Sequence, residues 1–278
     1  MDIKPLMKLS HYAILMTIII LSAGIGAYWW STKGFGEEKV SIVKVGDTIS
    51  VKYYGYIYYG GERRVFDTNI EEVAKDNSSY PKTVSYKWRG NFDPLTFKVG
   101  DHTMIDGFEK GVIGMKLNET KTIVVPPDEG YAFDWSKVKN YTLRQRIPVV
   151  ENLTLEEFKK RFGKENPSDN SVYKDKEHGW NSLVLEVNPT KNVVTIMNNP
   201  DAGKYYQPYE NITDFKIYVE KIRDGVVTFR YVIERMPILL PDGGLVDWQN
   251  DTSFRINYNK EVAGKTLYFV VTVIEIKD

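Results

Sequence analysis

The chain has 278 residues, with 37 Lys and Arg against 37 Asp and Glu, so its formal net charge is zero. It contains no cysteine, which excludes disulfides, thiolate nucleophiles and cysteine-bound metal sites. Three scattered histidines are too few for a histidine metal cluster. The balanced charge also lacks the basic excess typical of proteins whose main partner is a nucleic acid. We therefore expect no metal, no cofactor and no nucleic acid partner.

The N-terminal segment carries an uncharged apolar run from Tyr12 to Trp30. A helix over this run would be about 28 Å long, close to the hydrocarbon thickness of a bilayer. Two lysines precede the run and one follows it closely, which favours a cytoplasmic tail at residues 1–11. The prediction is a single-pass anchor in the cell membrane over residues 12–30, with the body of the chain on the extracytoplasmic side. A cleaved signal peptide and a buried core helix are the alternatives.

β-strand patterns dominate the region that follows. From Thr48 to Tyr58 apolar residues fall on one face of a period-two pattern, which predicts a half-buried strand, and residues 95–99 and 121–125 repeat it. Between those two segments, apolar residues from Ile105 to Met115 are spaced by three and four, which predicts one short amphipathic helix. The fold class is therefore α+β, with a mostly antiparallel sheet around a single helix.

Five short strings in this region share their order and spacing with a known family. They are Val45 to Gly55 (VGDTISVKYYG), Phe66-Asp67, Phe97 to Gly100 (FKVG), Ile105 to Met115 (IDGFEKGVIGM) and Val125 to Tyr131 (VPPDEGY). This set resembles the FKBP-type peptidyl-prolyl cis-trans isomerases. The closing segment, residues 263–276, resembles the last strand of that fold in its SlyD-like long type, where a domain is inserted in the flap. The resemblance implies an antiparallel half-barrel sheet wrapped around one short helix.

The resemblance also implies a proline pocket. Its substrate-binding side chains fall on Tyr53, Phe66, Leu95, Met104, Phe108 and Phe269. The catalytic groups fall on the Asp67 carboxylate, the Tyr131 hydroxyl and the backbone N–H of Ile105. Many relatives carry larger aromatic residues at the positions of Phe108 and Leu95, which implies a wider and less aromatic pocket here.

The predicted organisation has six parts. These are a cytoplasmic tail (1–11), a transmembrane anchor (12–30), a linker (31–39), an FKBP-like catalytic domain (40–133), an inserted domain (134–256) and a closing strand (257–278). In the insert, a capping box from Thr154 to Glu157 predicts a helix of two to three turns. Two hairpins, over residues 183–197 and 215–233, make the insert β-rich. Its aromatic residues predict either a surface for client polypeptides or a core of its own.

A faint internal echo complicates the end of the fold. Residues 199–219 and residues 259–273 share a Gly-Lys pair followed by a Phe-led β pattern. The sequence therefore leaves open which of the two segments closes the sheet of the FKBP-like domain.

The function implied by the resemblance is catalysis of peptidyl-prolyl cis-trans isomerisation (EC 5.2.1.8). Rotation about an X–Pro bond has a barrier close to 20 kcal/mol, and an enzyme need only bind the twisted amide better than the planar forms. The predicted partners are X-Pro segments of unfolded or nascent polypeptides and, through residues 12–30, the lipid bilayer. We expect an isomerase that assists the folding of exported or membrane-proximal proteins. A weakly catalytic or non-catalytic membrane-tethered chaperone that binds unfolded polypeptide is the alternative.

Overall fold

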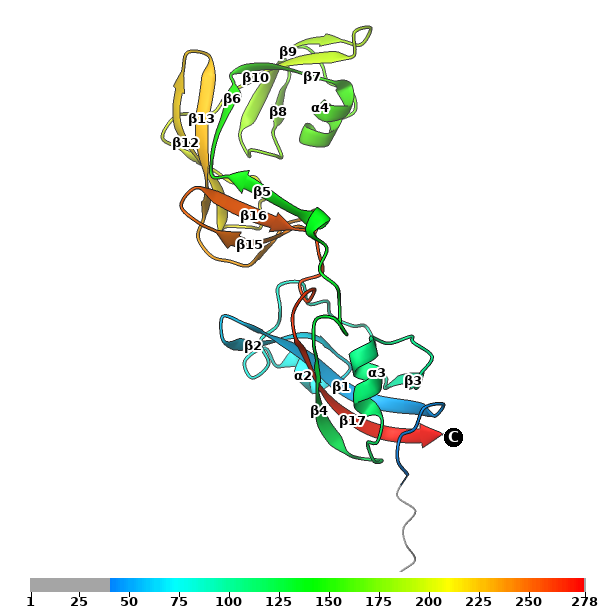
Figure 1. The fold of residues 1–278 in the computed structure, drawn as a ribbon. Helices are drawn as coiled ribbons and strands as arrows, with labels where there is room; N and C mark the ends of the chain where they lie inside the picture. The colour runs from blue at the N-terminus through cyan, green and yellow to red at the C-terminus, as the bar shows by residue number, and fades with distance from the viewer. Residues whose placement is uncertain (1–40, 278) are drawn as a thin grey trace, which may run out of the picture.

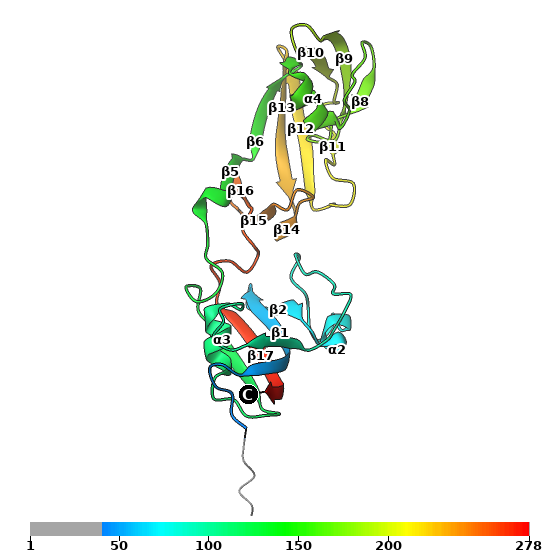
Figure 2. The same cartoon turned by 90° about the vertical axis from the view of Figure 1, so that its right-hand side faces the viewer.

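The computed structural model describes residues 41–277, which form two parts stacked end to end (Figures 1 and 2). The predicted tail, the anchor at 12–30 and the linker lie outside the described residues. Across residues 41–277, no helix combines the length and the apolar character needed to cross a membrane. The part nearer the N-terminus is built on a five-stranded antiparallel sheet with the order β2-β1-β17-β4, and β3 pairs with the free end of β1. Its elements are β1 (Thr48–Tyr59), β2 (Glu62–Thr68), α2 (Glu71–Lys75), β3 (Leu95–Lys98), α3 (Asp106–Val112), β4 (Thr120–Val125) and β17 (Leu267–Lys277).

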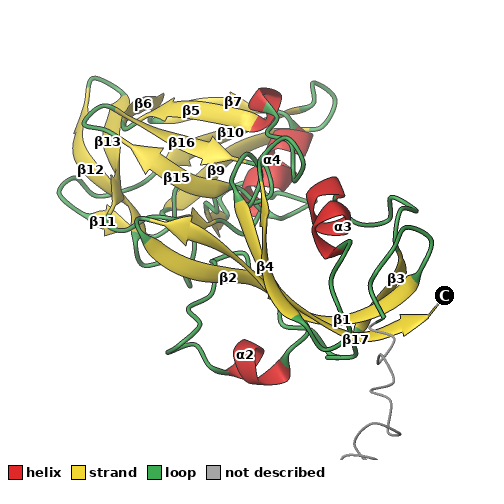
Figure 3. Cartoon of the chain, turned by 60° about the horizontal axis from the view of Figure 1, so that its bottom comes forward, coloured by secondary structure: helices red, strands yellow, loops and turns green. Residues whose placement is uncertain are grey.

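Helix α3 packs on one face of this sheet (Figure 3). Glycine makes the close approach possible, because a Cβ at Gly111 would lie only 2.2 Å from Ile123 Cγ2 on β4. The helix is shorter than its apolar spacing predicts. Ile113 is extended and Gly114 has a φ of +83°, so the chain leaves the helix and Gly114 N–H donates to the carbonyl of Val43. The last apolar residue of the pattern, Met115, is therefore buried by a turn instead of a helix.

Strand β17 closes the sheet and answers the question that the internal echo leaves open. It pairs antiparallel with β1 from Tyr56 to Thr48 on one side and with β4 on the other. Its segment Leu267 to Val273 alternates buried and half-buried residues, as expected for a central strand with one face on the core. The echo segment at residues 215–219 belongs to a different sheet.

The second part, which we call the insert, lies between β4 and β17 in the chain. It contains three four-stranded sheets, with the orders β7-β10-β9-β8, β11-β12-β13-β6 and β14-β15-β16-β5. Its elements are η1 (Trp135–Lys137), β5 (Val138–Thr142), β6 (Arg144–Pro148), β7 (Val150–Leu153), α4 (Leu155–Phe162), β8 (Val172–Lys174), β9 (Asn181–Asn188), β10 (Val193–Asn198), β11 (Tyr205–Tyr206), β12 (Phe215–Arg223), β13 (Val226–Ile233), β14 (Ile238–Leu239), β15 (Leu245–Gln249) and β16 (Ser253–Asn257).

In the insert, the segments with clear local sequence signals adopt the predicted structures. Thr154 and Glu157 make both hydrogen bonds of a capping box at the start of α4, and Gly163 ends the helix in the left-handed conformation. The hairpin of β12 and β13 turns through Asp224 and Gly225, both with positive φ, as a two-residue Asp-Gly turn requires. The aromatic residues of the insert differ in exposure, which leaves the client-binding role a prediction. Trp180 is fully buried, whereas Tyr205 and Trp248 are exposed.

Two connecting segments, residues 131–137 and 258–264, join the insert to the first part and run side by side (Figure 1). Gly264 N–H donates to the carbonyl of Tyr131 at 2.8 Å. The side chain of Asn259 bonds both the N–H and the carbonyl of Asp134, each at 2.9 Å. These bonds tie the two connections to each other.

Candidate active site

The structure brings three aromatic rings from different elements together between α3 and the sheet. Tyr53 comes from β1, Phe108 from α3 and Phe269 from β17. The ring centroids of Phe108 and Phe269 are 5.0 Å apart in an edge-to-face arrangement, and those of Tyr53 and Phe108 are 5.9 Å apart. All three side chains are buried. They form a closed apolar floor, and Phe66 from β2 packs edge-on against Phe269 with a centroid distance of 5.5 Å.

A glycine in β1 makes room for this floor. Gly55 pairs with Phe269 on one side and with Asp67 on the other. A Cβ at this position would lie 2.6 Å from Phe66 Cζ and 2.9 Å from Phe269 Cε1. A side chain at this position would therefore displace both rings. Because Gly55 has none, the two rings can pack against the strand.

A polar network lies beside the floor and centres on Asp67 at the end of β2. Tyr53 donates its hydroxyl to Asp67 Oδ2 at 2.6 Å. Arg89 grips the same carboxylate with two bonds, from Nε to Oδ1 at 3.0 Å and from Nη2 to Oδ2 at 2.8 Å, and Nη2 also donates to the Tyr53 oxygen at 2.8 Å. Burial, with the neighbouring Asp67, raises the pKa of Tyr53, so the phenol stays protonated and keeps donating. The carboxylate remains about one-third exposed and is open to a ligand on that side.

A free backbone donor lies at the start of α3. Ile105 is the N-cap residue, and its N–H has no acceptor among residues 41–277. Buried Glu109 fixes the preceding loop, because its carboxylate accepts from the N–H groups of Gly100 and Met104. The Ile105 N–H is thus held in place by the helix and by this loop, and it is available to a carbonyl oxygen.

Tyr131 completes the site from the first connection to the insert. Its ring packs against the core cluster that contains the aromatic floor. Burial raises the pKa of Tyr131, and Asp67 raises it further, so the hydroxyl is a neutral donor at physiological pH. The ammonium of Lys260, on the second connection, lies 4.2 Å from the centroid of the same ring. The site therefore touches both connections to the insert.

Comparison with known proteins identifies the family. Residues 39–143 match the FKBP-type peptidyl-prolyl cis-trans isomerase domain. FK506-binding protein 1 of Aspergillus oryzae is 31% identical over 100 residues, which cover 36% of this chain and 72% of that protein. The chain belongs to the FKBP-type peptidyl-prolyl cis-trans isomerase family.

Two further relatives of this FKBP-type chain define how far the likeness extends. The short-type peptidyl-prolyl cis-trans isomerase of Methanocaldococcus jannaschii is 38% identical over 109 residues, which cover 39% of this chain and 60% of that protein. The trigger factor of Hydrogenovibrio crunogenus is 37% identical over 87 residues, which cover 30% of this chain and 20% of the trigger factor. The FKBP-type match ends at residue 143, shortly after the insert begins.

Every site residue that the sequence predicts lies in or against one core cluster of the FKBP-type domain, or at its rim. The cluster contains Tyr53, Phe108 and Phe269, with Phe66, Leu95, Met104, Ile105 and Tyr131 half-buried against it. Asp67 stands at the rim through its bond to Tyr53. The structure thus places these residues together, and their individual roles remain predictions.

Sequence reasoning missed Arg89, which has as many bonds in the site as any predicted residue. It lies 22 residues along the chain from Asp67, in the long segment between β2 and β3. That segment has no hydrophobic periodicity, and an arginine in it has no spacing relation to the motif strings. Its neighbour Trp88 is exposed, and its ring packs edge-on against Phe92.

Proposed function

We propose that this chain is a peptidyl-prolyl cis-trans isomerase that acts on X-Pro segments of unfolded or nascent polypeptides. The observation that carries the proposal is the closed aromatic floor flanked by three polar groups: the Asp67 carboxylate, the Tyr131 hydroxyl and the free N–H of Ile105. Membership of the FKBP-type family supports it. No nucleophile or metal is needed, because the reaction breaks no covalent bond.

The proposed mechanism is preferential binding of the twisted amide. A pyrrolidine ring held against Phe108 and Phe269 leaves water, and the twisted amide loses less than the planar forms because it is less polar. The N–H of Ile105 and the hydroxyl of Tyr131 can each hold a carbonyl oxygen of the bound segment. Asp67, fixed by Tyr53 and Arg89, presents a charged acceptor at the rim. No group has to transfer a proton.

The first test is catalysis of exchange in a short X-Pro peptide, measured by NMR with the full chain. We expect faster cis/trans exchange, and we expect Tyr131→Phe to lower kcat/KM by about three- to tenfold, which is the loss of one neutral hydrogen bond. Unfolding should be nearly unaffected, because the ring remains. Equal activity of the variant would remove the hydroxyl from the mechanism. A folded wild-type protein without any acceleration would favour the alternative, a chaperone that binds unfolded polypeptide with little turnover.

We further propose a location and an organisation for this enzyme. The uncharged run at residues 12–30 supports a single-pass anchor in the cell membrane, with the isomerase on the extracytoplasmic side. A SlyD-like long organisation is supported by the position of the insert between β4 and β17. On the extracytoplasmic side of the membrane, the enzyme would assist the folding of exported or membrane-proximal proteins.

Protease protection in sealed cells tests this orientation. Externally added protease should degrade the body of the chain while the cell membrane is intact and leave a fragment that stays with the membrane. Protection of the body until the cells are lysed would contradict the proposed orientation. Recovery of the body in the fluid outside the cells would indicate a cleaved signal peptide instead of an anchor.

A further inference from the structure

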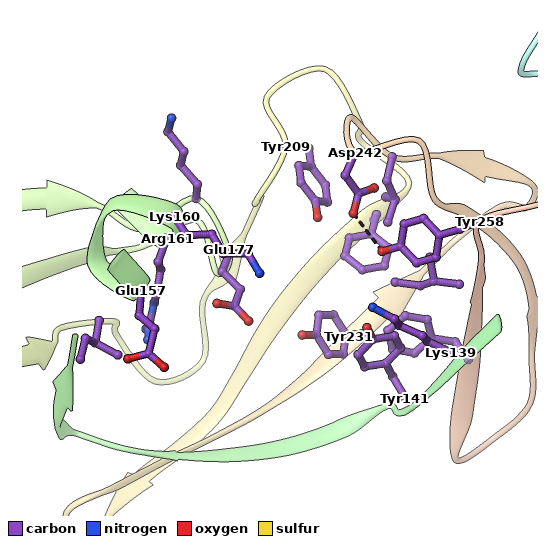
Figure 4. Close-up of a pocket in the computed structure, with 16 residues that line it drawn as sticks. Lys139, Tyr141, Glu157, Lys160, Arg161, Glu177, Tyr209, Tyr231, Asp242 and Tyr258 are labelled. Atoms are coloured by element: carbon purple, nitrogen blue, oxygen red, sulfur yellow. Dashed lines mark hydrogen bonds between the residues drawn. The ribbon is translucent and has the colours of Figure 1, made fainter. Parts of the chain in front are cut away.

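A cavity of about 580 Å³ lies in the insert, and it shares no lining residue with the proline pocket (Figure 4). One side is formed by α4 and the loop that carries Glu177, and the other by strands β5, β13 and β16 with their loops. Four tyrosines line it: Tyr141, Tyr209, Tyr231 and Tyr258. A volume of this size is typical of sites that hold small molecules or single side chains with part of their backbone.

Three of the four phenols have no hydrogen-bond partner among residues 41–277. Tyr258 donates its hydroxyl to Asp242 at 2.9 Å. The hydroxyls of Tyr141, Tyr209 and Tyr231 make no side-chain hydrogen bond within the described part of the chain, although Tyr231 packs in the core of the insert. Burial raises the pKa of Tyr231, and the nearby Glu177 carboxylate raises it further. Burial also raises the pKa of Tyr141 and of Tyr209, with smaller contributions from the carboxylates of Asp242 and Glu177. The carboxylate of Glu177 therefore acts on all three of these phenols, and that of Asp242 acts on Tyr141 and Tyr209.

Two carboxylates face this group of rings. Figure 4 shows the Glu177 carboxylate and the hydroxyls of Tyr209 and Tyr231 directed toward the same space. Glu177 has no ion pair among residues 41–277. Within the described part of the chain, Asp242 on the opposite wall accepts only from neutral donors, the Tyr258 hydroxyl and the N–H of Gly244. Aromatic faces with unpaired carboxylates form a site that attracts organic cations.

Four basic side chains, Lys139, Lys160, Arg161 and Lys176, line the same cavity, so its carboxylates do not act alone. Arg161 is already neutralised by Glu151 and Asp175, each at 2.7 Å. The ammonium of Lys160 points away from the tyrosines (Figure 4). Lys176 lies beside Gly163, at the C-terminal end of α4, where a helix favours positive charge.

Lys139 is the exception and serves as an internal precedent. Its ammonium lies 5.3 Å from the centroid of the Tyr258 ring, on the tyrosine side of the cavity, and it has no ion pair among the described residues. The chain itself therefore already places one ammonium against this aromatic wall.

We propose that this cavity is a binding site for an ammonium or guanidinium group, held by the tyrosine rings and by Glu177 and Asp242. Such a group can come from a lysine or arginine side chain of a bound polypeptide or from a free polyamine. In the first case the insert selects basic segments of the polypeptides on which the isomerase acts. The site does not depend on catalysis at the proline pocket, so the two are tested separately.

The experiment titrates the full chain with three short peptides that differ in one residue, Ac-Gly-Gly-X-Gly-Gly-amide with X as Lys, norleucine or Glu, and with 1,5-diaminopentane. Binding is followed through the NMR signals of the tyrosine rings. We expect the Lys peptide to bind about fivefold more tightly than the norleucine peptide, the gain of one exposed cation–π contact with a carboxylate nearby. Tight binding of the peptide alone identifies a polypeptide side chain as the guest. Equal binding of the diamine shows that the ammonium group suffices.

Matched variants locate the guest. Glu177→Gln should weaken Lys-peptide binding about threefold, and Lys139→Gln should strengthen it, because a competing internal cation is removed. Asp251→Asn is the control, because it also removes one negative charge but lies on an exposed loop outside the cavity. It should leave the affinity for the Lys peptide unchanged. The proposal is overturned if norleucine or Glu peptides bind as well as the Lys peptide, if no tyrosine signal moves, or if Asp251→Asn acts like Glu177→Gln.

Discussion

Replacement of Asp67 by alanine is expected to lower kcat/KM for an X-Pro peptide by roughly ten- to hundredfold, the loss of one charge-assisted hydrogen bond. The carboxylate is the only charged acceptor among the predicted catalytic groups, and its position is fixed by three hydrogen-bond donor atoms of Tyr53 and Arg89. The substitution removes the acceptor and releases the guanidinium from its partner. Because both side chains are about one-third exposed, we expect little change in the free energy of unfolding.

A double-mutant cycle with Arg89→Met separates direct from indirect roles. Arg89→Met alone should cost less than Asp67→Ala, since Tyr53 still holds the carboxylate. The double variant should be no worse than Asp67→Ala, because two residues that act as a unit are not additive. Lys75→Met is the control, as it breaks an exposed ion pair with Glu71 in the same segment of chain without touching the site. Strictly additive losses would mean that Arg89 contacts the substrate independently of Asp67.

Elements with local causes were predictable from the sequence. The alternation in β1, the capping box of α4 and the Asp-Gly turn of the β12–β13 hairpin each depend on residues within a few positions of one another. Helix α2 was not predicted, because its five residues have no side-chain cap and too few turns for a periodic pattern. The choice of closing strand was also beyond local signals, since β17 and the echo segment in β12 are both good strands. Only pairing with β1 over more than 200 residues of chain distinguishes them.

In the candidate site, too, residues on regular elements could be predicted from the sequence, whereas residues on irregular segments could not. The motif strings carry the positions of the aromatic floor and of Asp67, because those residues occupy regular elements with fixed spacing to their neighbours. Arg89 reaches Asp67 from an irregular segment, and the insert cavity is assembled from segments of three different sheets and α4. No spacing rule links such residues before the chain has folded. Site residues that are brought together by loops could therefore be identified only from the structure.

One such long-range contact connects the insert to the site. Glu261 lies on the second connection and is buried, with 6% of its surface exposed. Its Oε2 accepts from the N–H of Ser85 at 2.9 Å and from the Ser85 hydroxyl at 2.6 Å, while its Oε1 has no partner among the described residues. Ser85 lies four residues before Arg89 in the segment that delivers the guanidinium to Asp67. The segment is thus anchored to the chain that returns from the insert.

Glu261→Ala should therefore loosen the segment and lower kcat/KM by roughly tenfold, chiefly through a higher KM, because Arg89 and Asp67 are no longer held in one arrangement. Ser85→Ala removes one of the two bonds and should cost about threefold. Glu261→Gln is the informative partner, since its amide oxygen can still accept both bonds while its NH2 group faces the side on which Oε1 has no partner. It should retain most of the activity that the alanine variant loses. The NMR signal of the Arg89 guanidinium reports the cause directly. If that signal is unchanged in Glu261→Ala while activity falls, the loss comes from general destabilisation, and the anchor has no role in positioning the site.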